Sequence, residues 1–145
     1  MSIEPGERLV IDASVAVKWV VPEAGSERAE ALLDHNLMAP DLLFVECANV
    51  LWKKLHRGEL TRDEAEIAAR TLEQVDLSIV PAKGYFVRAL AIAAELDHPA
   101  YDGVYLAVAE GNGLRLVTAD DRLIRKVRQP QGQFGHLLAS FDEIP

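Results

Sequence analysis

The residues of this sequence that could do chemistry are four acids placed in or beside apolar segments: Asp12, Glu46, Asp102 and Asp120. The first and the last each follow a short, mostly apolar run, at 9–11 and 114–117. The second interrupts a long apolar segment, and the third directly precedes one. An ionised carboxylate in apolar surroundings destabilises a fold unless another group compensates for it. These four acids therefore need an explanation.

Considered one at a time, most of the four have an ordinary structural explanation. Asp12 and Asp120 could cap the helices that follow them, with Asp121 as a second candidate for the latter position. Asp102 could be a first-turn acid that the helix dipole stabilises. Glu46 is harder to explain, because it would have to reach solvent or pair with a buried arginine. A shared pocket accounts for all four at once.

Four carboxylates that share a pocket repel one another. Two of them about 5 Å apart repel by roughly 3 kcal/mol at an effective dielectric constant near 20. Protons or a divalent cation must therefore neutralise the cluster. The set holds no cysteine and no clustered histidine, so its hard oxygen donors favour Mg²⁺ or Mn²⁺ over Zn²⁺. Asn49, three residues after Glu46 on the same helix face, is a candidate to orient that carboxylate.

Short strands that alternate with helices must position these acids. The expected strands lie at 9–12, 37–40, 77–80, 114–117 and 137–141. The expected helices lie at 26–34, 42–57, 61–75, 85–96, 101–110 and 121–128, with a helix-compatible segment at 15–19. Three side chains mark helix starts: Ser26, Asp41, and Thr61, which forms a capping box with Glu64. This alternation predicts an α/β fold with a mostly parallel central sheet, whose ligands bind beyond the carboxyl ends of the strands.

Length and composition limit the other possibilities. The chain has 145 residues, half of them apolar, which predicts a single domain over 1–145 with its own core. The net charge of −8 argues against a general nucleic-acid binder, although basic runs occur at 53–57 and 122–128. The lone Cys47 and the lack of an apolar leader or membrane span favour a reducing, cytoplasmic setting.

Four segments around these acids resemble the PIN-domain ribonucleases, and specifically the VapC-type toxins of toxin–antitoxin pairs. The segments are Val10–Ser14, Glu46–Leu51, His98–Asp102 and Val117–Asp120. The resemblance covers about Arg8 to Phe141, essentially the whole domain. It implies a PIN-like three-layer α/β/α fold, with an acidic site that binds Mg²⁺ or Mn²⁺ at the carboxyl end of the sheet.

The resemblance also implies a role for each residue of the site. The catalytic acids would be Asp12, Glu46, Asp102 and Asp120, with the metal held by the three aspartates. Glu46 would hold a water molecule or help to remove its proton. The supporting polar residues would be Ser14, Asn49 and Thr118. The implied reaction is hydrolysis of RNA phosphodiester bonds by metal-activated water, which leaves 5′-phosphate and 3′-hydroxyl ends.

The implied partners are an RNA substrate, a VapB-like antitoxin protein and a second copy of the chain, with no membrane. The RNA backbone would be steered by side chains of the two basic runs: Lys53, Lys54, Arg122, Arg125 and Arg128. The prediction of a homodimer is also based on the large fraction of apolar residues and on Trp19 and Phe134, which we expect to be exposed until a partner covers them.

Three other functions are compatible with acids on an α/β fold. A receiver-type signalling domain would need an acidic pair after the first strand, and Asp12 is unpaired. A haloacid-dehalogenase-type phosphatase needs Asp-x-Asp, whereas Asp12 is followed by Ala13 and Ser14. A non-catalytic RNA- or protein-binding module on the same fold would lack one of the four acids, and none is missing. The sequence therefore predicts a metal-dependent endoribonuclease.

Overall fold

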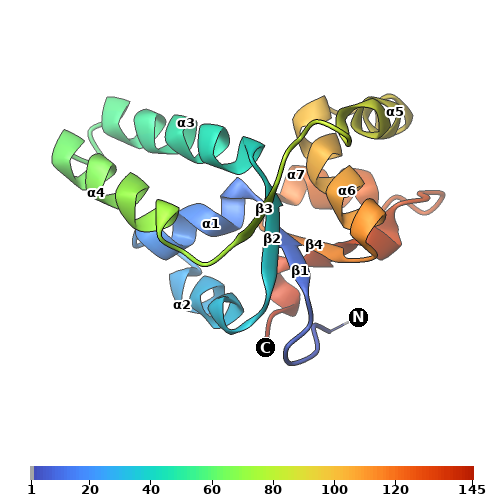
Figure 1. The fold of residues 1–145 in the computed structure, drawn as a ribbon, viewed down its shortest axis with the longest axis horizontal. Coiled ribbons are helices and arrows are strands. Elements are labelled where there is room, and N and C mark those ends of the chain that lie inside the picture. The colour runs from blue at the N-terminus through green and yellow to red at the C-terminus, as the bar shows by residue number, and fades with distance from the viewer. Residues whose placement is uncertain (1) are drawn as a thin grey trace.

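A parallel sheet of five strands forms the centre of the computed structural model, which describes residues 2–145 (Figure 1). The strands are β1 (Leu9–Ile11), β2 (Leu37–Pro40), β3 (Ser78–Val80), β4 (Arg115–Thr118) and β5 (Leu138–Ser140). Their order is β3-β2-β1-β4-β5, and every neighbouring pair is parallel. All residues of β1, β2 and β5 are buried, as expected for strands that are covered on both faces.

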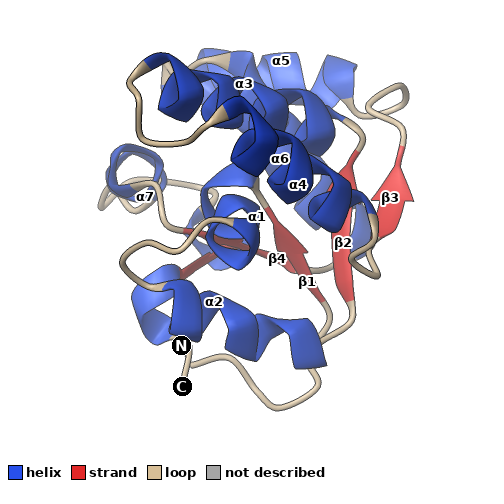
Figure 2. Cartoon of the chain, turned by 90° about the vertical axis from the view of Figure 1, so that its left-hand side faces the viewer, coloured by secondary structure: helices blue, strands red, loops and turns tan. Residues whose placement is uncertain are grey.

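Helices cover both faces of this sheet. Within residues 2–145 the α-helices are α1 (Ala13–Val20), α2 (Ser26–Glu30), α3 (Leu42–His56), α4 (Arg62–Glu73), α5 (Phe86–Leu96), α6 (Ala100–Asn112) and α7 (Asp121–Val127). Short 3₁₀ helices lie at Ala31–Asp34, Gly135–Leu137 and Phe141–Glu143. The first four α-helices pack together on one side of the sheet, and α6, with α5 outside it, covers the other (Figures 1 and 2). This arrangement confirms the predicted three-layer α/β/α fold.

Of the helix starts predicted at Asp41 and Thr61, only the second uses the side chain as a cap. Thr61 Oγ1 accepts a hydrogen bond from the Glu64 amide at 3.1 Å, and the Glu64 carboxylate accepts one from the Thr61 amide at 2.9 Å. The capping box is therefore confirmed. Asp41 precedes α3, but its carboxylate accepts a hydrogen bond from the Ala82 amide at 3.0 Å instead. It joins the end of β2 to the segment after β3.

Helix α2 begins at Ser26 as predicted, but its N-cap is Gly25 and not Ser26, and its α-helical part ends at Glu30 and not at Asp34. Gly25 holds the N-cap position with a φ of 88°, a left-handed conformation that glycine adopts without strain. The Ser26 hydroxyl instead accepts a hydrogen bond from the Glu23 amide at 3.0 Å and donates one to the Val21 carbonyl at 3.2 Å. After α2 the chain tightens into 3₁₀ geometry at Ala31, a change that apolar spacing does not reveal.

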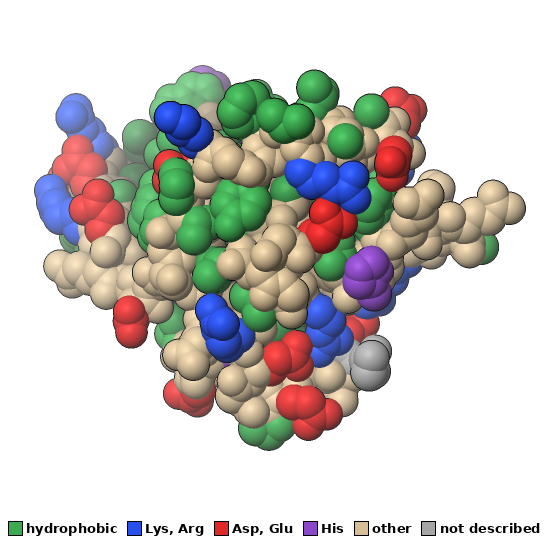
Figure 3. Space-filling view, turned by 45° about the vertical axis from the view of Figure 1, so that its right-hand side comes forward, with side chains coloured by type: hydrophobic (Ala, Val, Ile, Leu, Met, Phe, Trp, Pro, Cys, Tyr) green, Lys and Arg blue, Asp and Glu red, His purple; other side chains and the backbone are tan. Residues whose placement is uncertain are grey.

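The expectation that Trp19 and Phe134 are exposed is wrong. Phe134 is 3 % exposed within the core, and Trp19 is partly buried, with its indole Nε1 donating to the Ala29 carbonyl at 2.8 Å. The most exposed large apolar side chains lie on α3 to α6: Val45, Trp52, Ile67, Phe86, Val87, Leu90 and Tyr101. Figure 3 shows apolar side chains gathered along the upper part of the face on which α5 and α6 lie. None of the helices within residues 2–145 is long and apolar enough to cross a membrane.

Gly103 determines how closely α5 and α6 approach each other. A Cβ atom at this position would lie 2.5 Å from the backbone oxygen of Ala89 on α5, closer than non-bonded carbon and oxygen atoms come. Only a residue without a side chain allows this approach. Because Asp102 precedes Gly103, the same contact fixes the turn of α6 that carries Asp102.

Gly103→Ala is expected to lower the free energy of unfolding by about 1–3 kcal/mol, because the backbone of α5 must move to admit the methyl group. Urea denaturation followed by circular dichroism measures this change. Gly111→Ala is the matched control in the same helix, where the new Cβ would meet only the Tyr85 ring at 3.1 Å and where alanine favours the helix. Equal destabilisation by the two substitutions would contradict this account of Gly103.

Candidate active site

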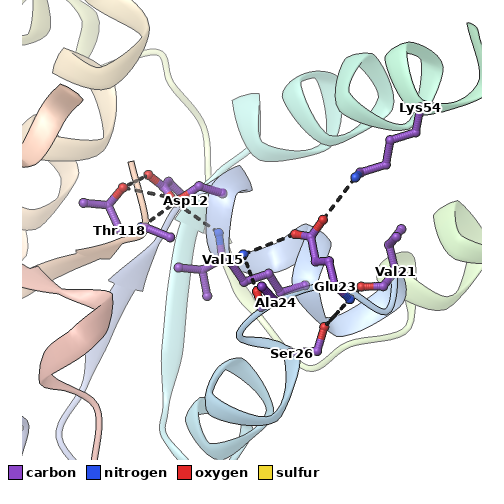
Figure 4. Close-up of polar contacts among 11 residues, drawn as sticks. Asp12, Val15, Val21, Glu23, Ala24, Ser26, Lys54 and Thr118 are labelled. Carbon is purple, nitrogen blue, oxygen red and sulfur yellow. Dashed lines mark hydrogen bonds and ion pairs between the residues drawn. The ribbon is translucent and has the colours of Figure 1, made fainter. Parts of the chain in front are cut away.

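The register of the sheet brings Asp12 and Thr118 to the same edge. Ile11 on β1 pairs with Val117 on β4. The residues that follow them, Asp12 and Thr118, therefore lie next to each other at the ends of the two strands. The Thr118 hydroxyl donates to Asp12 Oδ2 at 2.6 Å (Figure 4). This edge is the carboxyl end of the strands, where α/β proteins bind their ligands.

Ser14 completes a frame of hydrogen-bond donors around Asp12. Its hydroxyl donates to Asp12 Oδ1 at 2.5 Å, and its oxygen accepts a hydrogen bond from the Ala119 amide at 2.9 Å. The Val15 amide donates to the same Oδ1 at 3.3 Å, so Asp12 is also the N-cap of α1. Both carboxylate oxygens are held, which fixes the direction of the side chain.

Burial dominates the electrostatics of Asp12, which is 5 % exposed. It raises the pKa of the carboxyl to about 7, the hydrogen bonds from Ser14 and Thr118 oppose the increase, and the charge of Asp102 adds to it. Hydroxyl groups orient a carboxylate, but they carry no positive charge to balance it. The frame around Asp12 therefore positions a negative charge without neutralising it.

Helix α3 brings Glu46 to the same end of the sheet. The buried face of this helix consists of residues one turn apart: Leu43, Cys47 and Leu51. Glu46 lies beside that face and is half-buried. Burial raises the pKa of its carboxyl, the Tyr105 hydroxyl lowers it, and the charge of Asp102 raises it. Glu46 therefore behaves as a partly desolvated acid next to another acid.

Two buried side chains are affected by the charges of both Glu46 and Asp12. Burial raises the pKa of the Cys47 thiol to about 12, and the charges of Glu46 and Asp12 add to this increase. Burial also raises the pKa of the Tyr105 phenol, again with contributions from the same two acids. Both acids, one on α3 and one after β1, therefore lie close enough to Cys47 and Tyr105 to affect them electrostatically.

Asp102 connects the other acids electrostatically. Its Oδ2 accepts a hydrogen bond from His98 Nε2 at 2.5 Å, one turn earlier in the chain. Burial raises the pKa of the Asp102 carboxyl, His98 opposes the increase, and the charge of Asp120 adds to it. Besides burial, the charge of Asp102 in turn raises the pKa values of Asp12 and Glu46. All four predicted acids thus interact with at least one other.

Asp120, and not its neighbour Asp121, is the acid that acts on Asp102. Asp120 caps α7, because its Oδ1 accepts hydrogen bonds from the amides of Arg122 at 2.9 Å and Leu123 at 3.3 Å. Asp121 is exposed and lines a cavity of about 330 Å³ between α7, α1 and β5. The geometry therefore favours Asp120 as the fourth member of the acidic group.

Three further residues differ from what the sequence indicated. Asn49 is exposed on α3, and no hydrogen bond within residues 2–145 joins it to Glu46. His98 was not predicted to contact the acids, although its spacing of four residues from Asp102 is a signal for such a pair. Tyr105 was not predicted either, because a tyrosine within the apolar run of α6 looks like any other core residue.

Two of the five basic side chains that were expected to steer RNA are paired with carboxylates instead. Lys54 Nζ donates to Glu23 Oε2 at 3.0 Å, and Arg128 pairs with Glu143. The other three are exposed and form no ion pair with any residue of 2–145: Lys53, Arg122 and Arg125.

Glu23 is also bound by a second lysine. Lys18 Nζ donates to Glu23 Oε1 at 3.3 Å, while Lys54 donates to the other oxygen (Figure 4). Lys18 belongs to α1, which Asp12 caps, and Lys54 belongs to α3, which carries Glu46. One carboxylate therefore links the two helices that position these acids.

The donor set fits a hard divalent cation. Within residues 2–145 none of the four acids forms an ion pair with a lysine or arginine. The Tyr105 hydroxyl is buried and close enough to affect Glu46, but it has no acceptor in hydrogen-bonding geometry. Carboxylate oxygens without thiolates suit Mg²⁺ or Mn²⁺. Among residues 2–145, however, no three His, Cys, Asp or Glu side chains are grouped closely enough to hold a metal ion.

Comparison with known proteins identifies the family. The family described as "PIN domain" matches residues 9–129. Ribonuclease VapC3 of Pyrobaculum aerophilum is 37 % identical over 123 residues, which cover 82 % of this chain and 94 % of that protein. The chain belongs to the PIN-domain family. Its similarity to a VapC protein over most of its length confirms the VapC-type resemblance.

Solved structures share the fold at low sequence identity. A crystal structure from Pyrobaculum aerophilum has a TM-score of 0.68 at 23 % identity and covers 94 % of this chain and 85 % of that one. The crystal structure of VapBC2 from Rickettsia felis bound to a promoter DNA fragment contains a chain with a TM-score of 0.62 at 13 % identity. That match covers 92 % of this chain and 98 % of the other. At these identities the two structures support the fold.

In the absence of divalent cations, the contribution of Asp12 to the stability of the protein is expected to fall as the pH rises from about 4 to about 7. The folded state holds the Asp12 proton more tightly than the unfolded chain does, because the pKa rises from 3.8 to about 7 on burial. The unfolded chain therefore loses its proton first and becomes relatively more stable as the pH increases. A tenfold difference in proton affinity is about 1.4 kcal/mol, so the effect amounts to several kcal/mol.

Thermal unfolding in EDTA across this pH range measures the effect. Asp12→Asn removes the buried charge and should flatten the profile, so that the variant is more stable than the wild type above neutral pH. Glu4→Gln, at an exposed position before β1, is the control and should keep the wild-type slope. The same slope for wild type and Asp12→Asn would contradict the account of Asp12.

Proposed function

We propose that this protein is a Mg²⁺- or Mn²⁺-dependent endoribonuclease that acts as the toxin of a VapBC-type toxin–antitoxin pair. The observation that carries the proposal is that four acids affect one another electrostatically and lack a lysine or arginine partner: Asp12, Glu46, Asp102 and Asp120. The similarity to the PIN-domain family and to Ribonuclease VapC3 supports the same class of reaction.

In this proposal the cation is held by the three aspartates: Asp12, Asp102 and Asp120. When bound, it supplies Lewis-acid chemistry that orients the phosphodiester and offsets the charge that develops on its oxygens. Asp12 is the fixed ligand, because Ser14 and Thr118 hold both of its oxygens. The hydrogen bond from His98 leaves Asp102 one oxygen free to bind.

Glu46 is proposed to position the attacking water and to accept its proton. Burial raises the pKa of this carboxyl and so brings its proton affinity closer to neutral pH, where a general base is most effective. The buried Tyr105 hydroxyl beside it limits where the carboxyl can turn. The water attacks phosphorus in line with the 3′ oxygen, and the bond between phosphorus and the 3′ oxygen breaks. The 3′ oxygen gains a proton from solvent, so that 5′-phosphate and 3′-hydroxyl ends result.

Asp12→Asn, Asp120→Asn and Glu46→Gln are each expected to slow cleavage of single-stranded RNA by about a hundredfold or more, since each removes a ligand or the proton acceptor. Initial rates on a fluorescent RNA in Mg²⁺ measure this loss, and EDTA should abolish the wild-type rate. Asp121→Asn is the matched control, with the same change of charge one residue away, and should retain activity. Cleavage that persists in EDTA, or RNA binding by the wild type without cleavage, would refute the proposal.

A protein partner and a homodimer belong to the same proposal. One chain of the solved VapBC2 structure shares this fold, which supports an antitoxin partner, and we propose that this partner covers the acidic end of the sheet. For the homodimer, the support is the group of exposed apolar side chains on α5 and at the start of α6: Phe86, Val87, Leu90 and Tyr101. An exposed apolar group of this size is typical of an interaction surface.

Leu90→Glu is expected to convert the homodimer to a monomer, because it places a charge in the middle of the exposed apolar group on α5. Light scattering during gel filtration at micromolar concentration measures the mass. Ile67→Glu introduces the same charge at a similarly exposed apolar position on α4 and should leave the dimer intact. A wild-type chain that is monomeric under these conditions would contradict the dimer.

A further inference from the structure

A basic pocket lies beside the acidic site, and apart from His98 its residues have no role in the mechanism above. It has a volume of about 270 Å³ and is lined by His98, Arg122, Arg125, Lys126 and Gln129. Among the described residues no carboxylate lines this pocket, although the chain has a net charge of −8. The pocket therefore offers an anion a local environment that most of the protein does not.

The cationic side chains of this pocket form no ion pairs within residues 2–145. Arg122 and Arg125 are exposed, Lys126 is half-buried, and none of them forms an ion pair with residues 2–145. The dipole of α7 favours Arg125 and Lys126 in its last turn but disfavours a cation such as Arg122 in its first. Helix stability therefore does not explain why Arg122 is basic.

The pocket adjoins the acidic group on two sides. His98 lines the pocket and also donates to Asp102 Oδ2 at 2.5 Å. Asp120 caps α7, the helix whose side chains form the basic wall. An anion in the pocket would thus lie next to a phosphate held at the acids, on the side of His98 and α7.

We propose that this pocket binds a backbone phosphate of the RNA next to the one that is cleaved. The inference rests on the proposed nuclease function and names the group by which the substrate is positioned. Arginine matches a phosphate with two parallel hydrogen bonds, and phosphate contacts set the register of a nucleic acid without reading its sequence. Arg122 and Arg125 are the phosphate ligands, and Lys126 adds a third positive charge to the lining of the pocket.

A second pocket adjoins the basic pocket and suits the sugar or base of the next nucleotide. This second pocket, of about 270 Å³, shares Lys126 and Gln129 with the first. Its remaining wall includes Gln131 and Gln133 of the loop that follows α7, with Glu95 as the acidic group at its rim. Figure 1 shows this loop projecting from the body of the protein beyond α6. Amide side chains donate and accept hydrogen bonds, as bases and ribose hydroxyls require.

The Arg122→Gln, Arg125→Gln double variant tests the proposal by steady-state cleavage of a short single-stranded RNA in Mg²⁺. The KM is expected to rise about tenfold, equivalent to about 1.4 kcal/mol, with a smaller change in kcat. The dependence of log KM on log salt should also become shallower, because fewer phosphate contacts are made. Arg8→Gln, Arg70→Gln removes the same charge from exposed positions before β1 and late in α4 and should leave KM unchanged.

A chemically modified substrate provides the decisive comparison. Once wild-type products locate the cut, an uncharged methylphosphonate is placed at the linkage on either side of it. One of these substitutions should raise the wild-type KM about as much as the double variant does, and should have no further effect in the double variant. Wild-type cleavage with an unchanged KM in the double variant, or additive effects of variant and methylphosphonate, would overturn the phosphate pocket alone. Failure of the wild type to cleave RNA would overturn the proposed function as well.

Discussion

The placement of a buried carboxylate between two hydroxyl groups is the constraint on which the rest of the site depends. Asp12 receives hydrogen bonds from Ser14 in the first turn of α1 and from Thr118 at the end of β4. These bonds orient the charge, but burial still penalises it, as the raised pKa of about 7 shows. Stability and function are therefore opposed at this residue, and a bound cation would relieve the conflict.

The order of the strands explains how acids far apart in the sequence meet. β1 is the middle strand, so the carboxyl end that Asp12 follows is flanked by the ends of β2 and β4. The chain after β2 becomes α3 with Glu46, and the chain after β4 becomes α7 with Asp120 at its cap. α6 crosses back over the sheet and brings Asp102 to the same end. Its closeness to α5 depends on Gly103.

The parts of this arrangement that could be predicted from sequence are those with a local signal. Strands buried on both faces appear as short apolar runs, and an acid that interrupts an apolar helix, as Glu46 does, is conspicuous. The exposure of Trp19 and Phe134 could not be predicted, because it depends on the segments that pack over them. The proximity of Tyr105 to Glu46 depends on how α6 packs against α3. The pairing of Lys54 with Glu23 depends on the conformation of the segment between α1 and α2, which carries Glu23. Neither contact can be predicted from the spacing of residues along one helix.

The two lysines that share Glu23 impose a constraint on how this sequence can change. Glu23 holds Lys18 of α1 with one oxygen and Lys54 of α3 with the other. Loss of the carboxylate alone would leave two ammonium groups, both mostly shielded from solvent, to repel each other across the gap between the helices. Position 23 is therefore expected to covary with positions 18 and 54 among homologues, so that a neutral residue at 23 is accompanied by a neutral residue at 18 or 54.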